Sequence, residues 1–346
     1  MAFSDLFRRP PGDGAILHLP DRRNGRRMAV VSLVLAAAGI RHMAVLPWLR
    51  ARRLGDLERR ALASSGCEIA HRLPRSARLL VTDRSGPVIR AEKTLRIRYD
   101  LASALARPLD RRELFLPILF HPDQINAETY RAADRLSARR NRPIRILFAG
   151  NCDPATYDTA LIGRQYGLAN RHELHRLAQS LPGDMAVFPQ SRAELDAMIG
   201  EAERSGRKID RLVWIDTRRF RIPAAQWFKL IASADIFLCT PGVRYPWCQN
   251  LNEAMACGTV ALLEYPGLYN PALEPGVNAL TLDAADLGAS IASMLALGET
   301  EIARLSAAAA AYHREHLSLG RAIGAIGAFL ADPDMPALDW YLAGKA

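Results

Sequence analysis

Short apolar runs alternate with helical segments along most of this chain, and this alternation limits its fold more than any other feature. Residues 144–150, Ile-Arg-Ile-Leu-Phe-Ala-Gly, form the clearest strand, because they are almost entirely apolar and end in glycine. Further strands at residues 186–188, 211–215, 236–239 and 260–263 alternate with helices at 156–180, 192–205, 224–234 and 249–256. Strands that alternate with helices are typical of βαβ units, so the second half predicts a parallel sheet with helices on both faces.

The first half has the same pattern in a less regular form. A strand at residues 15–19, a helix at 26–39 and a strand at 42–46 make a β-loop-α-β unit. Weaker strand signals follow at residues 79–82, 88–90 and 114–120, and residues 48–62 have helical spacing. After residue 282 the pattern becomes helical, at 284–297, 301–316 and 320–330. The chain is therefore expected to be an α/β protein with two Rossmann-like domains and a helical C-terminus.

The charged stretch at residues 131–143 predicts the domain boundary. We place an N-terminal domain at residues 1–142, a second domain at 143–330 and a tail at 331–346 that packs back on the first domain. Ligands bind at the carboxyl ends of strands in open parallel sheets. Two such domains that face each other are thus expected to hold a cleft between those ends.

Arginine dominates the charge of the chain. Lys and Arg number 46 and Asp and Glu 36, for a net charge of +10. Arginine binds phosphates and other anionic surfaces, but it also accumulates from codon bias, so this excess alone names no partner. A basic α/β protein that binds nucleic acid remains an alternative, although no recognisable nucleic-acid motif supports it. The five cysteines have no C-x-x-C spacing, which argues against a disulfide framework or a zinc site and favours a cytoplasmic protein.

Two segments bear on membranes. Residues 22–39 resemble a signal peptide in charge and hydropathy, but they lie inside the chain, follow a strand and are too short to span a bilayer, so we interpret them as a buried helix. Residues 48–62 mix arginine with leucine at helical spacing. They either cover the core with a basic outer face or lie on an anionic membrane, which would make the protein peripheral at the inner face.

The most informative stretch runs from residue 233 to residue 282. It contains Ala-Asp-Ile-Phe at 234–237, Pro-Gly at 241–242, and Glu-Ala-Met-Ala-Cys-Gly-Thr-Val at 253–260. These motifs resemble the donor-binding half of nucleotide-sugar-dependent glycosyltransferases of the GT-B fold, in the pattern of glycosyltransferase family 1 and of exostosin-like enzymes. The resemblance implies that residues 143–330 bind a nucleotide-sugar donor, and that the N-terminal domain binds the acceptor.

The resemblance also implies roles for single residues. Glu253 would accept hydrogen bonds from the ribose hydroxyls, near a helix N-terminus that attracts phosphate. Phe220 would lie near the base, and the diphosphate needs cations or backbone donors. The remaining candidates for binding the donor are Gly150, Asn151, Arg218, Gly242, Arg244 and Asn252.

Three sequence features bear on the stereochemical outcome of the reaction and on the need for a metal ion. Many retaining members carry a second glutamate eight positions before the ribose-binding one, where this chain has Tyr245, so we expect an inverting enzyme, with a retaining one as the alternative. The inverting branch usually has arginine two or three residues before the glutamate, where this chain has Leu251, flanked by Asn250 and Asn252. The D-x-D string at 332–334 lies far from any strand end, so no metal or other cofactor is expected.

Inversion needs a catalytic base from the acceptor domain. His121 follows an apolar run in His-Pro-Asp and is the first candidate, with Asp123 second. Asp21 lies in the first βα loop, whereas His18 lies within the first strand and is expected in the core. The sequence thus predicts glycosyl transfer from a nucleotide sugar to a glycan or lipid-linked acceptor in cell-surface polysaccharide synthesis, without a nucleic-acid partner.

Overall fold

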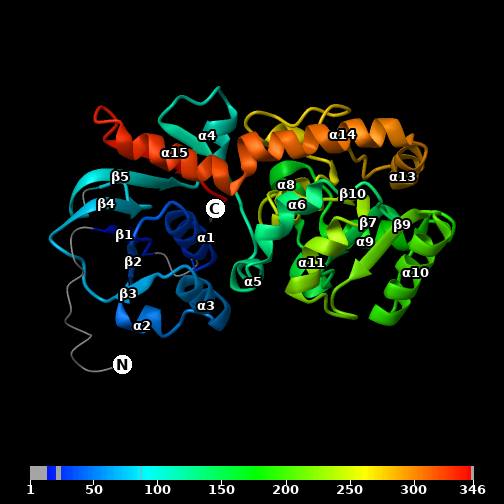
Figure 1. Cartoon of the computed structure of the whole chain (residues 1–346), viewed down its shortest axis with the longest axis horizontal. Coiled ribbons are helices and arrows are strands. Elements are labelled where there is room, and N and C mark those ends of the chain that lie inside the picture. Colours follow the sequence, from blue (N-terminus) through cyan, green and yellow to red (C-terminus); the bar gives the residue numbers. More distant parts are fainter. Residues whose placement is uncertain (1–13, 21–24, 87, 344–346) are drawn as a thin grey trace. The chain divides into compact units, whose positions relative to one another are not determined.

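The chain forms two compact units, each built on its own sheet. The computed structural model describes residues 14–20, 25–86 and 88–343 (Figure 1). Unit 1 comprises residues 1–128 and 316–346, and unit 2 comprises residues 129–315. The sequence places the boundary at residue 142, whereas the contacts divide the chain at 128/129 and again at 315/316.

The sheet of unit 1 is entirely parallel in the part of the chain that the structure describes. Its order is β3-β2-β1-β4-β5-β13-β6. The strands are β1 Ala15–His18, β2 His42–Val45, β3 Glu68–Ala70, β4 Ser76–Thr82, β5 Arg90–Arg98, β6 Glu113–Phe115 and β13 Ala337–Tyr341. The helices are α1 Gly25–Ala37, α2 Trp48–Ala51, α3 Asp56–Ser64, α4 Leu101–Leu105, α5 Pro122–Asn126 and α15 Leu319–Ala331.

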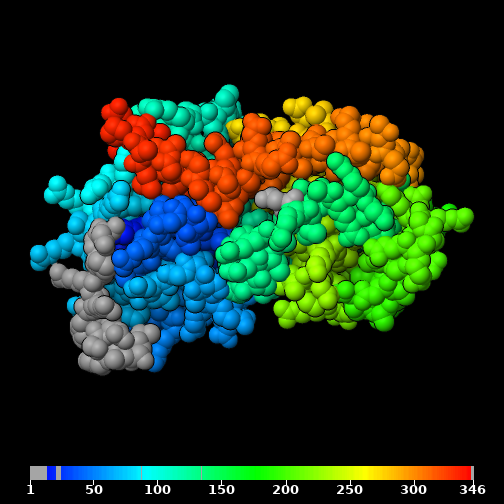
Figure 2. All heavy atoms as spheres, in the orientation of Figure 1, coloured from blue at the N-terminus to red at the C-terminus, as the bar shows by residue number. Residues whose placement is uncertain are grey.

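The C-terminal segment completes unit 1. Strand β13 lies between β5 and β6, and its Trp340 is fully buried. Asp339 forms ion pairs with Arg96 and Arg98 on β5, at 2.7 and 2.9 Å. Helix α15 contacts α1, and Figure 2 shows this red segment against the blue N-terminal one. The tail that the sequence expects to return to the N-terminal domain is thus a strand of its sheet.

Unit 2 also has a wholly parallel sheet among its described strands. Its order is β12-β11-β10-β7-β9-β8. The strands are β7 Ile144–Gly150, β8 Ala186–Val187, β9 Ile209–Asp216, β10 Ala234–Leu238, β11 Val260–Leu263 and β12 Ala279–Thr281. The helices are α6 Ala133–Ser137, α7 Pro154–Tyr157, α8 Ala160–Tyr166, α9 Arg171–Gln179, α10 Arg192–Ser205, α11 Ala224–Ile231, α12 Gln249–Ala256, α13 Leu287–Leu295 and α14 Glu299–Tyr312. The prediction of two Rossmann-like α/β sheets and a largely helical C-terminus is confirmed.

Several predicted elements are wrong in extent, for reasons that the backbone shows. The helix expected at residues 156–180 is three helices, because Gly167 ends α8 with a φ of 68° and Asn170 begins α9 as its N-cap. The helix expected at residues 48–62 is two, interrupted before Gly55. The strand expected at residues 114–120 ends at Phe115, two residues before Pro117.

The prediction for strand β5 was wrong for a different reason. The sequence predicts a strand only at residues 88–90, but the strand runs from Arg90 to Arg98. Its residues alternate between charged and apolar, and most are only half-buried. Apolar runs identify strands that are covered on both faces, so a strand with a polar face is missed when only such runs are sought.

Candidate active site

The sheet of unit 2 has a switch point between β7 and β10. From β7 the chain continues to β8 and β9 on one side, and then returns to β10 and β11 on the other. In open parallel sheets such a reversal leaves a crevice at the carboxyl ends of the two strands, where ligands bind. Gly150 and Asn151 stand at the end of β7, and Thr240 to Gly242 follow β10. The geometry therefore brings together two loops that the sequence identifies separately.

A buried arginine connects these two loops. Arg171, the first residue of α9, is only 4% exposed. Its Nε donates to Thr240 Oγ1 at 2.7 Å, and its Nη1 donates to the carbonyl of Asn151 at 3.2 Å. Its Nη2 donates to the carbonyl of Pro241 and to the sulfur of Cys248, both at 3.5 Å. The guanidinium thus lies at the switch point itself.

Arg171 has only neutral neighbours among the residues that the structure describes. Its hydrogen bonds all go to uncharged acceptors, and the centre of the Tyr157 ring lies 4.1 Å from its guanidinium carbon. Burial of a cation is costly unless an opposite charge compensates it, and neutral acceptors and an aromatic ring compensate it in part. A bound anion would supply the missing charge.

Glycine at the end of β7 keeps this arrangement open. A Cβ on Gly150 would lie 3.0 Å from the ring of Phe148 and 3.4 Å from Nη1 of Arg171. A larger residue at position 150 would therefore crowd the guanidinium. Sequence reasoning missed Arg171, because arginines are abundant and the position fell inside a predicted long helix. The N-cap Asn170 is the signal that places residue 171 at a helix start, and so at the edge of the sheet.

Helix α12 offers backbone donors at the same edge. Its N-cap is Cys248, which accepts no capping hydrogen bond among the described residues, and its first turn contains no acidic residue. By contrast, Asn170 caps α9 and Ser191 caps α10. Asn250 in the first turn of α12 donates to the carbonyl of Ala149 on β7 at 3.2 Å. The first N–H groups of α12 therefore lie beside the end of β7, where helix N-termini bind phosphate.

Glu253 and Asn252 are both buried on α12, each about 1% exposed. The carboxylate of Glu253 accepts a hydrogen bond from Nε1 of Trp227 on α11 at 2.6 Å. Neither amide atom of Asn252 has a hydrogen-bond partner in the described part of the chain. A buried amide without partners costs roughly 1–3 kcal/mol, so Asn252 is an unusual residue for a position that serves packing alone.

The other predicted donor residues lie in loops at this edge. Gly242 donates to the carbonyl of Tyr245 at 3.1 Å, and a Cβ at Gly242 would come within 2.8 Å of that oxygen. Arg244 in the same loop is exposed, and Phe220 is half-buried before α11. The guanidinium of Arg218 pairs with Asp216, with Nη2 2.6 Å from Oδ2, so its charge is already compensated.

In unit 1, His121 and Asp123 form a helix start. Nδ1 of His121 accepts a hydrogen bond from the backbone N–H of Asp123 at 3.2 Å, as the N-cap of α5. The same ring nitrogen lies 3.6 Å from the carboxylate of Asp123, and both side chains are about one-third exposed. The structure therefore gives His121 a local capping role.

His18 lies at the switch point of unit 1. The strand order reverses between β1 and β4, and His18, the last residue of β1, is paired with Thr82 and is close to Asp83. Burial lowers the pKa of His18, whereas the Asp83 carboxylate raises it. Its Nδ1 is buried and has no hydrogen-bond partner among the described residues. The sequence expected His18 in the core, and the structure places it at a strand end. Asp21 lies outside the described residues.

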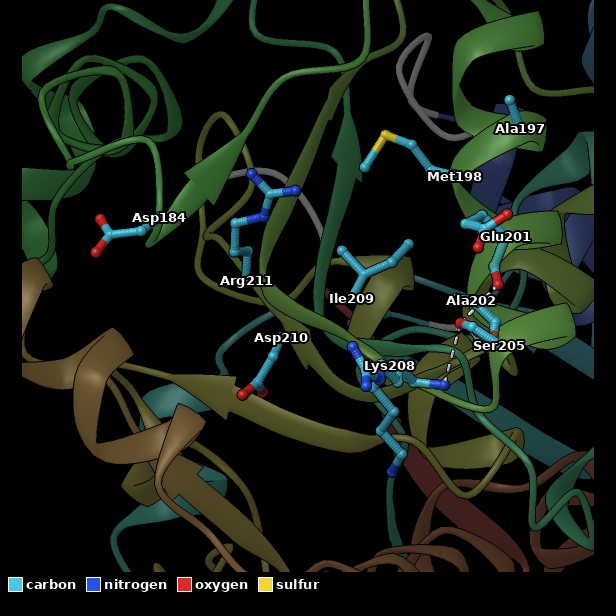
Figure 3. A pocket seen from close by; sticks show the side chains of 11 residues that line it. Asp184, Ala197, Met198, Glu201, Ala202, Ser205, Lys208, Ile209, Asp210 and Arg211 are labelled. Carbon is cyan, nitrogen blue, oxygen red and sulfur yellow. Dashed lines mark hydrogen bonds between the residues drawn. The ribbon is translucent and has the colours of Figure 1, made fainter.

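A groove of about 880 Å³ lies at the opposite, amino-terminal end of β9 (Figure 3). Helix α10 and the start of β9 form it, and it contains none of the predicted site residues. Lys208 at its rim is neutralised by Asp235 and Glu299, at 2.6 and 2.7 Å. The groove carries both positive and negative side chains, whereas the carboxyl edge of the sheet holds Arg171, whose neighbours are neutral.

The described residues, 14–20, 25–86 and 88–343, contain neither a cluster of metal ligands nor a membrane-spanning helix. Within those ranges, no three His, Cys, Asp or Glu side chains gather as metal ligands would. None of the described helices is long and apolar enough to cross a bilayer. The five cysteines are all free and buried.

No family model matches the chain. No curated protein matches it at a significant level. Among solved structures, Anabaena HepE in complex with UDP is 13% identical, with 92% of this chain and 99% of that chain covered and a TM-score of 0.49. A glycosyltransferase from Rickettsia africae is 9% identical over 93% and 98% of the two chains, with a TM-score of 0.48. Sucrose-phosphate synthase from Thermosynechococcus elongatus is 14% identical over 91% and 98%, with a TM-score of 0.46. Likenesses this distant assign no residue of this chain a role.

Proposed function

We propose that this chain is a GT-B-type glycosyltransferase whose unit 2 binds a nucleotide-sugar donor at the switch point between β7 and β10. The observation that carries the proposal is Arg171, a buried cation with only neutral neighbours in the described part of the chain. A diphosphate carries two or three negative charges, and a guanidinium matches its oxygens in pairs. Because Arg171 and the N-terminus of α12 lie at one edge, both contribute to phosphate binding without a metal.

Donor recognition continues along α12. Glu253 is proposed to bind the ribose hydroxyls and Asn252 to supply a second polar contact, with Gly242, Arg244, Gly150 and Asn151 lining the approach and Phe220 near the base. The motif at residues 253–260 supports this assignment. Since Glu253 now accepts from the indole of Trp227, a ribose would compete with that hydrogen bond or share the carboxylate with it. Arg218 is a weaker candidate, because Asp216 already occupies its guanidinium.

Acceptor activation is assigned to unit 1. A base must take a proton from the acceptor hydroxyl, and an imidazole that is neutral near pH 7 suits this task. His121 and Asp123 remain the residues that the sequence predicts. The switch point of unit 1 favours His18, because burial lowers its pKa and so keeps it neutral. With Tyr245 where retaining enzymes have a glutamate, we propose inversion, and a glycan or lipid-linked molecule of a surface polysaccharide as acceptor.

Thermal unfolding with a panel of nucleoside diphosphates and sugar nucleotides tests the donor site. A ligand that binds only the folded state stabilises it by about 2.7 kcal/mol at one hundred times its Kd. We expect one nucleotide class to raise the melting temperature of the wild-type chain, without added metal. Arg171→Gln should abolish this shift, and Arg171→Lys should retain a reduced one, because lysine keeps the charge but not the paired donors.

Arg142 provides a matched control. It is also a buried arginine held by neutral oxygens, with Nη1 2.8 Å from both the Ala234 carbonyl and Thr259 Oγ1. Because it lies before β7, at the opposite edge of the sheet, Arg142→Gln should lower stability yet leave the nucleotide shift unchanged. An equal nucleotide shift in Arg171→Gln and wild type would exclude the proposed phosphate site. Once a donor is known, the anomeric configuration of the product separates inversion from retention.

A further inference from the structure

A small apolar surface stands out in unit 1. Trp48 and Leu49, the first two residues of α2, are 39% and 63% exposed. In the described part of the chain, the other large apolar side chain with comparable exposure is Val277 in unit 2, at 43%. Two adjacent exposed apolar residues on one helical turn are unusual in a protein whose other large side chains are covered. With Arg52 and Arg53 they form what we name the Trp48 patch.

The local structure holds these two side chains outward. Helix α2 begins directly after β2, at the carboxyl edge of the sheet, and Ala51 donates to the carbonyl of Pro47 at 3.0 Å. Arg50 is buried, and its Nη1 donates to the carbonyl of Leu19 at 2.5 Å. Successive residues of a helix point about 100° apart, so the buried Arg50 fixes the rotation of this turn and leaves Trp48 and Leu49 on its other sides. Their exposure therefore follows from an anchored turn.

Two exposed arginines follow the apolar pair directly in the chain. The guanidinium carbon of Arg52 lies 3.9 Å from the centre of the Trp48 ring, and Arg53 beside it is exposed. Residues 41–78 contain nine arginines and only three acidic residues. The acidic residues nearest in sequence to the patch are Asp56 and Glu58, in the first turn of α3. The segment that carries the patch is thus rich in arginine.

We infer that the Trp48 patch docks unit 1 onto an anionic phospholipid surface. Tryptophan and leucine gain free energy when they enter the boundary between headgroups and acyl chains, where the indole is preferred. Arginines next to them bind lipid phosphates and add electrostatic attraction to anionic headgroups. Trp48 and Leu49 supply the apolar component, and Arg52 and Arg53 supply the basic one. The inference concerns unit 1 alone and does not depend on glycosyl transfer.

Sedimentation with vesicles tests this surface. The full chain is mixed with vesicles of phosphatidylcholine alone, or of phosphatidylcholine with 30% phosphatidylglycerol, at low and high salt. We expect binding to the anionic vesicles, weakened by salt because screening shortens the range of the attraction to about 10 Å at 0.1 M. Trp48→Ser with Leu49→Ser should reduce the vesicle affinity about tenfold or more. Arg52→Glu with Arg53→Glu should reduce it about 30-fold or more.

Two variants in unit 2 provide matched controls. Val277→Ser removes a similarly exposed apolar side chain, and Arg176→Glu with Arg207→Glu reverses two exposed arginines. Neither should change vesicle affinity by more than about twofold, because neither lies on the patch. Tryptophan emission gives a second readout, since Trp214, Trp247 and Trp340 are buried and Trp227 is half-buried in unit 2. The vesicle-induced blue shift should disappear in the Trp48 variant.

Three results would overturn the inference. The first is the absence of binding to anionic vesicles, and the second is equal binding by wild type and both patch variants. The third is concentration-dependent self-association that the Trp48 and Leu49 substitutions abolish, without vesicle binding, which would make the patch a protein interface. Nucleotide-dependent thermal shifts are read separately, so failure here leaves the donor site untouched and the reverse also holds.

Discussion

Both units have a parallel sheet whose strand order reverses beside its first strand, but they differ in strand order and in the chemistry at this switch point. In unit 2 the reversal between β7 and β10 holds Arg171, a buried cation with neutral neighbours among the described residues. In unit 1 the reversal between β1 and β4 holds His18, an imidazole near the carboxylate of Asp83. Topology therefore determines where each site lies, and individual residues determine which step each site can perform.

The distribution of charge separates the units in a second way. Unit 1 contains 25 of the lysines and arginines and 16 acidic residues, whereas unit 2 contains 21 and 20. Nearly the whole net charge thus belongs to unit 1, although the proposed phosphate site belongs to unit 2. Net charge predicts surfaces that attract anions at long range, while an anion site depends on local charge that no neighbour compensates.

The largest expected effect concerns His18. If it is the base, His18→Asn should lower kcat by about 10²–10⁴-fold, because a positioned base contributes a factor of that size. The Kd of the nucleotide, which we assign to unit 2, should not change. Initial rates with the donor selected by the unfolding screen measure the first quantity, and calorimetry measures the second.

His121→Asn is the matched comparison. Because asparagine also caps helices well, this substitution should preserve the start of α5, and kcat should fall less than threefold. A large loss of kcat in His121→Asn, with wild-type rates in His18→Asn, would reverse the assignment in favour of the residue that the sequence predicts.

The separate stability of the units gives the next prediction. Trp340 in unit 1 and Trp214 in unit 2 are both almost fully buried. Each substitution to alanine should cost about 3–5 kcal/mol, because it leaves a large cavity. Trp340→Ala should lower the unfolding transition of unit 1 and leave the nucleotide-stabilised transition in place, whereas Trp214→Ala should do the opposite. One shared transition that both variants lower equally would show that the units unfold together.

The same comparison shows what the sequence could predict. Strand β7, helices α10 and α12 and strand β11 have the predicted bounds, because each combines a strong apolar period with a cap, a glycine or a turn at its ends. Strand β13 was not predicted as a strand, because its place between β5 and β6 depends on residues more than two hundred positions away. Local periodicity carries no information about such a partner.

The candidate site also contains some residues that the sequence could identify and others that it could not. The motif around Glu253 could be found from sequence, since it is contiguous. Arg171 could not, because its role arises from Thr240, Asn151 and Pro241, which converge only in the folded sheet. His18 was assigned to the core because it ends an apolar run, and only the strand order shows that this end is a switch point.

Two carboxylates, one in each unit, have pKa values that are shifted in opposite directions. Hydrogen bonds from Arg107 lower the pKa of Glu113 in unit 1 to about 2. Burial raises the pKa of Glu264, at the end of β11 in unit 2, to about 7. Glu113 therefore stabilises the folded state at neutral pH, and this contribution is lost as pH falls from about 4.5 through 2. Glu264 does the reverse, and it lowers stability as pH rises from about 4.5 through 7.

Two isosteric variants test these signs. Glu264→Gln should raise the stability of unit 2 at pH 8.5 by about 1–2 kcal/mol, after allowance for partial exposure, and by only about a quarter as much at pH 5. Glu113→Gln should destabilise unit 1 at pH 7, because Arg107 and Tyr341 lose their charged partner. Thermal unfolding at pH 5, 7 and 8.5 measures both. A stabilisation by Glu264→Gln that is equal at pH 5 and pH 8.5 would contradict the raised pKa.

The smallest expected effect is a displacement of the pH profile of catalysis. A base must be unprotonated, so kcat/KM should fall at low pH with a midpoint at the pKa of the free enzyme's base. For His18 that midpoint should lie below 6.5, because burial lowers its pKa. Asp83 raises this pKa and Arg84 lowers it, so Asp83→Asn should move the midpoint to lower pH and Arg84→Gln to higher pH. Opposite displacements of the midpoint by the two substitutions would assign the titration to His18, since a base at His121 would respond to neither. A pH profile that both variants leave unchanged would show that His18 is not the base.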